Sequence, residues 1–200
     1  MARCSECGLL FVPEHPPDAR YHRIVHDKAV NGPKTKICDG FHFITHQSLI
    51  GIQRLAQETA SAALCETGYD ITSFYGVKKK FDEHNTLAVV CVRDGRVTGL
   101  LVSRERECKY KVELDSFRQE DGRNSWRPTS ADEVETHRRR AVDMIWVLKS
   151  KRRQGVAQGL IHALAENCGL RIEDIAHMTP FREDALRLWQ GLGLSTIFAV

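Results

Sequence analysis

The sequence lacks any hydrophobic run long enough to cross a membrane, since no stretch approaches the roughly 20 apolar residues of a bilayer span. No apolar segment typical of a secretory signal follows Met1, and the number of cysteines, seven, is odd. A secreted disulfide framework is therefore not indicated. We expect a reduced intracellular compartment, cytoplasmic in a prokaryote or nuclear in a eukaryote, and no membrane partner.

A large excess of charge of one sign is also missing. The formal net charge is +3 at pH 7, which is too small to indicate nucleic acid as a partner but leaves that option open. The chain does have a hydrophobic fraction of 42% and a charged fraction of 28% over 200 residues. These values fit one globular domain of ordinary size together with a small module.

Two cysteines and two histidines near the N-terminus have the spacing of a zinc finger. Cys4 and Cys7 are separated by two residues, and His22 and His26 by three, which places both imidazoles on one helical face. Zinc prefers four tetrahedral nitrogen or sulfur ligands, and this set supplies them. Gly8, directly after the second cysteine, suits the positive φ that such a knuckle often requires.

We predict a C2H2-like zinc finger over residues 1–32. So short a module cannot build a stable core alone, so bound Zn²⁺ would supply most of its folding energy. The residues just before the first histidine offer one arginine, Arg20, for reading bases, and a single finger reads only about 3 base pairs. We therefore interpret the finger as structural or partner-binding. The alternative is that its cysteines and histidines are scattered surface residues.

After a turn-rich linker at 31–34, the hydrophobic pattern alternates between strands and helices. The order of elements predicts an α/β (α+β) domain over residues 40–200, with a mixed twisted sheet and flanking helices. Arg93-Asp94-Gly95 predicts a hairpin turn, and the polar segment 104–140 is expected to be a long loop. We expect helices over 45–65, 154–168 and 183–190, and strands over 86–92, 96–103, 142–148, 174–178 and 196–200.

The segment 145–164 carries the clearest indication of ligand binding. A buried strand runs into a short basic loop and then into a helix that opens at Gly155. The backbone N–H groups of such a loop and helix N-terminus can cradle phosphate oxygens, and small residues let a pyrophosphate approach closely. Arg152 and Arg153 add positive charge. The alternative is an ordinary strand-to-helix turn with solvated arginines.

This segment resembles the acyl-CoA signature of the GNAT acetyltransferases. The chain as a whole resembles the cohesin acetyltransferase family of sister-chromatid cohesion factors. Four features carry the resemblance: the finger at residues 4–26, a V-x-G strand at 97–99, the I-W-V strand at 145–147 and the R-R-x-x-V-A run at 152–157. The final segment of the family pattern is altered here, at residues 176–181.

The resemblance implies an acetyl-CoA-dependent N-acetyltransferase with a structural zinc and, as acceptor, a protein lysine. It places the pantetheine of acetyl-CoA along Ile145, Trp146 and Val147. The family's long tails for chromatin and replication partners are not implied, since the chain starts at the finger. The pyrophosphate is expected on the loop and helix start formed by Arg152, Arg153, Gln154, Gly155, Val156, Ala157 and Gln158.

The expected catalytic groups depart from the family pattern. Family members carry a serine just before the R-I-W-V motif and an aspartate before the later proline, whereas this chain has Asp143 and Thr179 there. A lysine amine has an ordinary pKa of about 10.4 and must lose a proton before it attacks a thioester. We predict that Asp143 accepts this proton and that Thr179 orients it or a bridging water. The alternative is that Asp143 marks an exposed strand start and pairs with Arg138, Arg139 or Arg140.

Two other functions compete with lysine acetylation: acetylation of a small amine, and a zinc-finger interaction module on a catalytically silent acetyltransferase fold. The backbone N–H of Trp146 or Val147 is a candidate to stabilise the oxyanion. No tyrosine follows Tyr110. The sequence therefore assigns no group that protonates the leaving thiolate.

Overall fold

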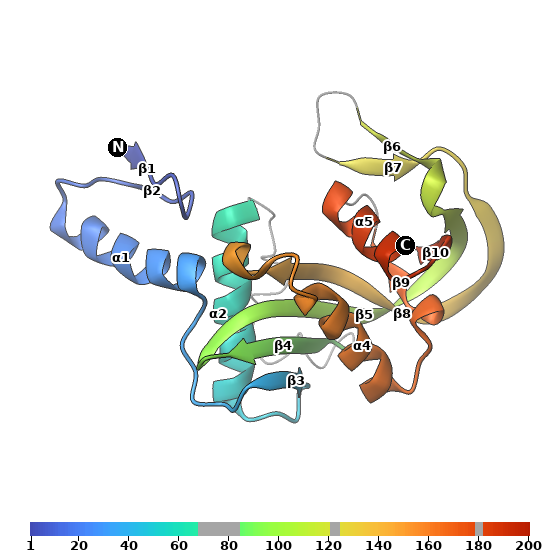
Figure 1. The fold of residues 1–200 in the computed structure, drawn as a ribbon, viewed down its shortest axis with the longest axis horizontal. Coiled ribbons are helices and arrows are strands. Elements are labelled where there is room, and N and C mark those ends of the chain that lie inside the picture. The colour runs from blue at the N-terminus through green and yellow to red at the C-terminus, as the bar shows by residue number, and fades with distance from the viewer. Residues whose placement is uncertain (68–84, 121–124, 179–181) are drawn as a thin grey trace.

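The computed structural model describes residues 1–67, 85–120, 125–178 and 182–200. Within these ranges the chain forms a mixed sheet with helices on both faces and a small N-terminal hairpin-and-helix unit (Figure 1). The elements are β1 (Ala2–Arg3), β2 (Leu10–Phe11), α1 (Pro16–Asn31), β3 (Gly40–Ile44), α2 (Ile50–Thr67), β4 (Leu87–Arg93), β5 (Arg96–Glu113), β6 (Phe117–Gln119), β7 (Trp126–Pro128), β8 (Asp132–Val147), α4 (Val156–Cys168), β9 (Ala176–His177), α5 (Glu183–Gly191) and β10 (Thr196–Ala199).

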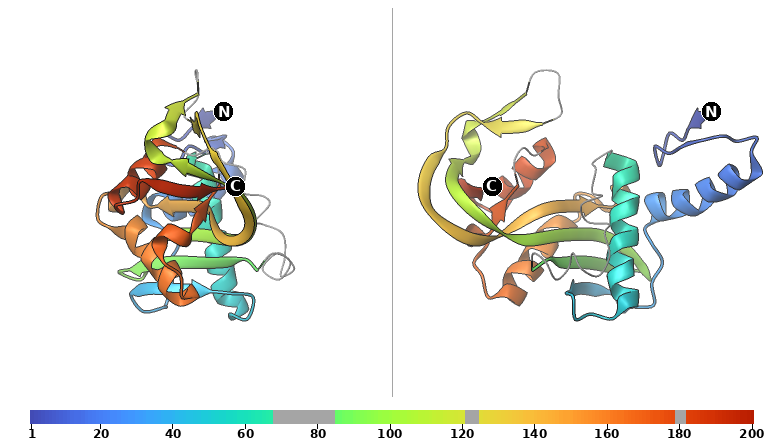
Figure 2. Two further views of the ribbon diagram at one scale, coloured as in Figure 1. Left: turned by 90° about the vertical axis from the view of Figure 1, so that its right-hand side faces the viewer. Right: turned by 180° about the vertical axis from the view of Figure 1, so that it is seen from behind.

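Six strands form the main sheet, in the order β10-β9-β8-β5-β4-β3. The pairs from β3 to β8 are antiparallel, whereas β9 lies parallel to both β8 and β10. The last strand also pairs antiparallel with the end of β5, where Thr196 lies opposite Glu113. Strands β5, β8, β9 and β10 therefore close into a ring, which the long curved strands β5 and β8 make possible (Figure 2).

The segment 104–140, predicted as a long loop, is the main correction to the sequence analysis. Strand β5 continues through it to Glu113, β8 already begins at Asp132, and the two strands pair along this stretch. Charge replaces hydrophobicity there, since Glu105 lies opposite Arg140 and Glu107 opposite Arg138. Cross-strand pairs of opposite charge stabilise a sheet but leave no apolar alternation to detect.

Most other predicted elements agree with the structure to within a few residues. The helix predicted over 45–65 is α2, and those predicted over 154–168 and 183–190 are α4 and α5. Asp94 and Gly95 have φ values of 54° and 67°, as a tight hairpin turn between β4 and β5 requires. Strand β3 was not predicted, and β9 is shorter than expected.

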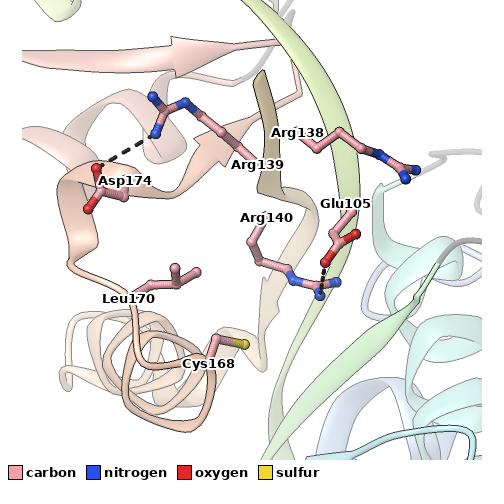
Figure 3. A pocket seen from close by; sticks show the side chains of 7 residues that line it. All are labelled: Glu105, Arg138, Arg139, Arg140, Cys168, Leu170 and Asp174. Atoms are coloured by element: carbon pink, nitrogen blue, oxygen red, sulfur yellow. Dashed lines mark hydrogen bonds and ion pairs between the residues drawn. The ribbon is translucent and has the colours of Figure 1, made fainter. Parts of the chain in front are cut away.

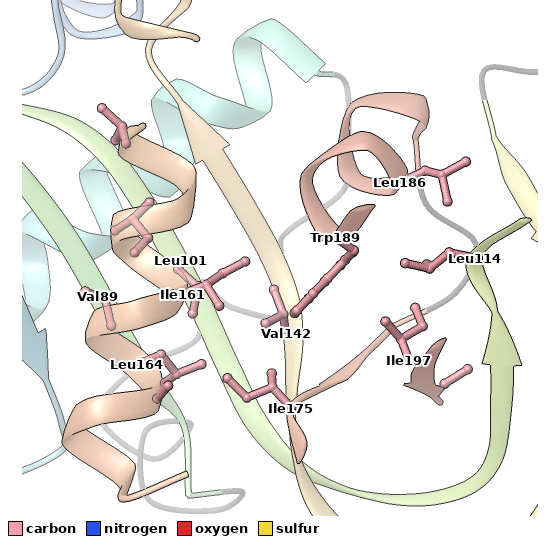
Figure 4. Packing of buried hydrophobic residues seen from close by; sticks show 14 of the residues in the cluster. Val89, Leu101, Leu114, Val142, Ile161, Leu164, Ile175, Leu186, Trp189 and Ile197 are labelled. Atoms are coloured by element: carbon pink, nitrogen blue, oxygen red, sulfur yellow. The ribbon is translucent and has the colours of Figure 1, made fainter. Parts of the chain in front are cut away.

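The two faces of the sheet are covered by different helices. Helices α4 and α5 pack on one face, called here the α4 face, in a core that includes Leu101, Val142 and Trp189 (Figure 4). Helix α2 packs on the other, the α2 face, against Leu100, Val102 and Trp146 among others. A Cβ added at Gly99 in β5 would lie 2.7 Å from Cγ1 of Val156, so this glycine lets the start of α4 approach the sheet.

Helix α1 joins the N-terminal unit to the rest of the chain. Its C-terminal end lies against α2, and two ion pairs fix it there. Asp27 pairs with Arg96 of β5 at 3.3 Å, and Lys28 pairs with Glu58 of α2 at 2.9 Å. The division into a finger over 1–32 and a domain over 40–200 stays a prediction. None of the described helices is long and apolar enough to cross a membrane.

Candidate functional site

The four predicted metal ligands lie together at the N-terminal unit, and their ligand atoms are all within 4.8 Å of one another. Sγ of Cys4 is 3.4 Å from Nδ1 of His26, and Sγ of Cys7 is 3.5 Å from Nε2 of His22. Nitrogen and sulfur ligands of a tetrahedral zinc are about 3.5 Å apart. The cluster therefore has the spacing of a site that could hold a metal ion.

The surroundings of this cluster suit ligation. Gly8 has a φ of 75°, and its N–H donates to the carbonyl of Cys4 at 3.0 Å, which closes the knuckle. The backbone N–H of Cys7 lowers the pKa of the Cys4 thiol to about 6, so the thiolate that a metal requires is favoured at neutral pH. Nε2 of His26 lies 3.0 Å from the Glu6 carboxylate, the partner that commonly orients a ligating histidine.

Asp143 is the extra residue of a β-bulge in β8. Val102 lies opposite Met144 and Ser103 opposite Val142, so Asp143 has no partner residue in β5. A bulge of this kind resets the alternation of side chains along a strand. Val142 packs on the α4 face, whereas Met144 packs on the α2 face. The carboxylate of Asp143 also lies on the α2 face, beside Arg104.

Strands β8 and β9 part at this bulge. The two strands pair only at residues 141 and 142 of β8, and the N–H of Met178 donates to the carbonyl of Val142 at 3.1 Å. In the described part of the chain no strand pairs with that edge over residues 143–147. The N–H of Leu148 donates to Thr98 of β5 at 2.9 Å. Because backbone groups alternate in direction along a strand, the N–H of Val147 faces the unpaired edge and that of Trp146 faces β5.

The unpaired edge leads into the predicted phosphate loop. Arg153 and Gly155 have φ values of 61° and 75°, and a non-glycine residue in this conformation marks strain of the kind found at functional sites. Gly155 caps α4 without a side-chain hydrogen bond, which leaves the first N–H groups of the helix available to an anion. A Cβ added at Gly155 would meet no atom within 4 Å, so the loop faces open space.

The side chains of this loop already have protein partners. Nε of Arg152 donates to the carbonyl of Val147 at 3.1 Å, and its Nη2 contacts the carboxylate of Glu66. Glu66 also accepts a hydrogen bond of 2.8 Å from Nε1 of Trp146. Arg153 pairs with Asp184 of α5 at 3.3 Å. Glu66 was missed by sequence analysis because an acid near a helix end carries no signal of contacts 80 and 86 residues away.

Asp143 is held by two arginines of β5 and is 15% exposed in mid-strand. Its Oδ2 lies 3.2 Å from Nε of Arg104 and 3.2 Å from Nη2 of Arg106, whereas Oδ1 has only a contact of 3.5 Å with Arg106. The expected alternative, an exposed acid paired with one of the arginines 138–140, is therefore wrong. Thr179, the predicted partner of Asp143, lies outside the described residues.

The three consecutive arginines of β8 line a hollow of ≈ 330 Å³ at the C-terminal end of α4, away from the phosphate loop (Figure 3). Arg140 is buried and pairs with Glu105 at 3.3 Å. Arg139 pairs with Asp174 at 3.6 Å. Two of the three arginines are therefore neutralised by acids, Arg140 by Glu105 and Arg139 by Asp174. We interpret this basic group as stabilising the sheet.

A buried histidine lies where β8 and β9 part. His177 is opposite Val142 and only 6% exposed, and its Nδ1 donates to the carbonyl of Met178 at 2.6 Å. Burial lowers the pKa of His177 to about 4, so the imidazole is neutral at pH 7. Its ring packs edge-on against Trp189 of α5, at 5.6 Å between centroids. Nε1 of Trp189 is itself buried and has no hydrogen-bond partner in the described part of the chain.

No family model and no curated protein matches the sequence. Among solved structures, the chain is similar to the acetyltransferase domain of xEco2 bound to a K105-CoA conjugate, with a TM-score of 0.62 and 17% identity over 83% of this chain and 94% of that one. A second structure of the xEco2 domain has a TM-score of 0.60 at 17% identity, over 83% of this chain and 93% of that one.

An aminoglycoside acetyltransferase from an uncultured soil metagenomic sample matches less well, with a TM-score of 0.46 and 17% identity over 79% of this chain and 92% of that one. The likeness to xEco2, a cohesin acetyltransferase, establishes the fold. The chain has the fold of an acetyltransferase domain, a mixed sheet with flanking helices, as its resemblance to the GNAT and cohesin acetyltransferases predicted.

The low pKa of His177 predicts a loss of stability in mild acid. Between pH 6.5 and pH 4 the unfolded chain binds a proton at this residue that the folded chain does not. The contribution of His177 to stability is therefore complete above pH 6.5 and falls toward pH 4, by roughly 3 kcal/mol. Urea unfolding across this range should show a weaker pH dependence in His177→Gln than in the wild type. The exposed His137→Gln should behave like the wild type, and identical pH profiles for all three proteins would contradict the assignment.

Proposed function

We propose that this chain is an acetyl-CoA-dependent N-acetyltransferase whose acceptor is a lysine side chain of a protein. The observation that carries the proposal is the unpaired edge of β8 over residues 143–147, which runs into the uncapped N-terminus of α4 at Gly155. An extended pantetheine can hydrogen-bond to such an edge as an added strand would, and its pyrophosphate can then reach the helix start. The fold shared with a CoA-bound acetyltransferase domain supports this placement.

The residues of the loop and strand fit acetyl-CoA in different ways. Val147 presents its backbone N–H to the unpaired edge, where it would stabilise the oxyanion of the tetrahedral intermediate. Trp146 directs its indole N–H to Glu66 on the α2 face, so its contribution is to hold the strand in place. Arg152 and Arg153 lie beside the cradle, where pairing with Glu66 and Asp184 offsets their charge. The backbone N–H groups at the start of the helix would therefore carry most of the phosphate binding.

We propose Asp143 as the group that accepts the proton of the acceptor amine. The acetyl group would lie at the β8 edge, and the carboxylate faces the α2 side of that edge, so the amine would approach from the α2 face. The two arginines hold mainly Oδ2, which leaves Oδ1 for the ammonium group. After Oδ1 takes one proton from the ammonium group, the amine nitrogen would attack the thioester carbon. When the C–S bond breaks, coenzyme A would leave as a thiolate, and the second proton of the nitrogen would pass through water to that thiolate.

We further propose that Cys4, Cys7, His22 and His26 hold one structural Zn²⁺. A set of two sulfur and two nitrogen ligands is typical of structural rather than catalytic zinc sites. The β1–β2 hairpin has only two residue pairs, Ala2 with Phe11 and Arg3 with Leu10. So small a unit depends on its metal for stability.

We expect one zinc per chain in the purified protein, and Cys7→Ser should lower this content to near zero. The substitution removes a thiolate from a site that needs four ligands, so the finger should also lose helical structure. Metal analysis and circular dichroism measure the two effects. Cys38→Ser removes an exposed cysteine outside the cluster and should keep the zinc. A full zinc content in Cys7→Ser would exclude the proposed ligand set.

The two glycines at the ends of α4 allow a matched test of acetyl-CoA binding. Gly155 and Gly169 have φ values of 75° and 64°, and neither has an atom within 4 Å of an added Cβ. Alanine at either position therefore causes similar backbone strain, of about 1–2 kcal/mol. Only Gly155→Ala places a methyl group in front of the phosphate cradle. It should weaken acetyl-CoA binding about tenfold or more by calorimetric titration. Equal affinities in Gly155→Ala and Gly169→Ala would place the pyrophosphate elsewhere.

Asp143→Asn keeps the shape of the side chain but removes the base. Turnover on a lysine peptide should fall by about 10²–10⁴, whereas acetyl-CoA affinity should change little because the cofactor lies on the other side of the strand edge. Asp174→Asn, which also removes an acid paired with arginines, should retain the wild-type rate. Full turnover in Asp143→Asn, with an unchanged pH profile, would show that another group accepts the proton.

A further inference from the structure

The unpaired edge of β8 is closed at one end by β9. The two strands pair only at Ala141 and Val142 of β8, and His177 of β9 lies opposite Val142. The N–H of Met178 also donates to the carbonyl of Val142 at 3.1 Å. A group that lies along residues 143–147 therefore cannot continue past Val142 between the two strands. We call this point, at Val142 and His177, the closed end of the edge.

The direction of acetyl-CoA along the edge follows from the place of its pyrophosphate. That group is proposed at Gly155, beyond Val147, so the pantetheine would run from residue 147 toward residue 143 and bring the thioester close to Asp143. The acyl carbons would then lie next to the closed end. Because the carboxylate of Asp143 and the incoming amine occupy the α2 face, a longer acyl chain would have to extend toward the α4 face.

Trp189 of α5 fills the α4 face at the closed end. Its indole reaches from α5 toward Val142 (Figure 4), and its ring packs edge-on against that of His177, with 5.6 Å between the centroids. The side chain is 0% exposed and belongs to the same core cluster as Val142. Because protein cores are close-packed, the ring leaves no space there for additional carbon atoms.

The indole of Trp189 also carries an energetic penalty. Its Nε1 is buried and has no hydrogen-bond partner in the described part of the chain. An unpaired buried donor destabilises a folded protein, and phenylalanine or leucine would pack at this position without such a donor. What tryptophan adds over these residues is volume. The unpaired N–H therefore indicates that the position requires the bulk of the ring rather than a hydrogen bond.

We propose that Trp189 restricts the acyl donor to acetyl-CoA, because its ring occupies the space that the additional carbons of a longer acyl chain would need. The inference rests on the proposed function, since it takes the β8 edge as the site of the pantetheine. It names a residue that selects among acyl donors. The phosphate loop would bind a part that all acyl-CoA molecules share, and Asp143 would act on the amine, so neither can make this selection.

The test compares acetyl-CoA with butyryl-CoA, which differs only in its longer acyl chain. Their affinities for the zinc-loaded full chain are measured by calorimetric titration in the absence of an acceptor. The wild type should bind acetyl-CoA about tenfold or more tightly than butyryl-CoA, as expected when extra carbon atoms enter a packed core. Trp189→Leu, which removes the ring but keeps an apolar side chain, should reduce this ratio to near one.

Leu186→Ala is the matched control. Leu186 also lies in α5 and is buried, but its side chain is on the side of Leu114, away from Val142 (Figure 4). The substitution opens space in the same core but not at the closed end, so it should keep the wild-type ratio. Trp189→Phe is a milder change, and its ratio should fall between those of the wild type and Trp189→Leu. Thermal unfolding identifies the variants that are folded.

Equal affinities of the wild type for the two donors would overturn the inference, as would an unchanged ratio in folded Trp189→Leu. If Trp189→Leu does not fold, an unchanged ratio in Trp189→Phe is the result that overturns it. An equal loss of the ratio in Leu186→Ala would also contradict it. No binding of either donor by the wild type would count against the proposed function as well, whereas acetyl-CoA binding without discrimination would count against this inference alone.

Discussion

Between Val142 and Met144, strand β8 carries one residue more than β5 does opposite it. In a regular strand Asp143 would share its face with residues 145 and 147, because side chains alternate with a period of two. The extra residue instead places Asp143 on the same side as Trp146 and Leu148, which pack on α2. It also coincides with the end of pairing between β8 and β9. One inserted residue thus positions the acid, opens the strand edge and orients the tryptophan.

The site then divides between the two faces of the sheet. The start of α4 and its uncapped N–H groups lie on one face, and the arginine-clamped carboxylate lies on the other. Glu66 joins the two, since it contacts Trp146 of the strand and Arg152 of the loop from helix α2. The β8 edge is the place where groups bound on the two sides can meet. A two-sided arrangement lets a sheet hold a cofactor and an acceptor without competition for the same surface.

Features set by local chemistry could be predicted from sequence. The spacing of Cys4, Cys7, His22 and His26 fixes which side chains can meet. Gly155 marks the start of a helix because few other residues adopt its φ of 75°. The paired strands within 104–140 could not be predicted, because their residues are mostly charged. The alternation of apolar and polar residues that identifies a strand is therefore missing from the sequence there. The partners of Asp143 were also unpredictable, since a bulge changes which face a residue takes and leaves no trace in composition.

Three consecutive residues of helix α1 connect the metal cluster to the sheet, and this limits how far the N-terminal unit can move relative to the sheet. His26 belongs to the metal cluster, and the next two residues, Asp27 and Lys28, hold the helix to β5 and α2. A continuous helix through these positions leaves no hinge between cluster and sheet. The metal cluster is thus carried on a continuous helix that is fixed to the sheet on the α2 side. Such a helix would hold any segment bound at the cluster at one distance from the β8 edge, whereas a flexible tether would allow a range of distances.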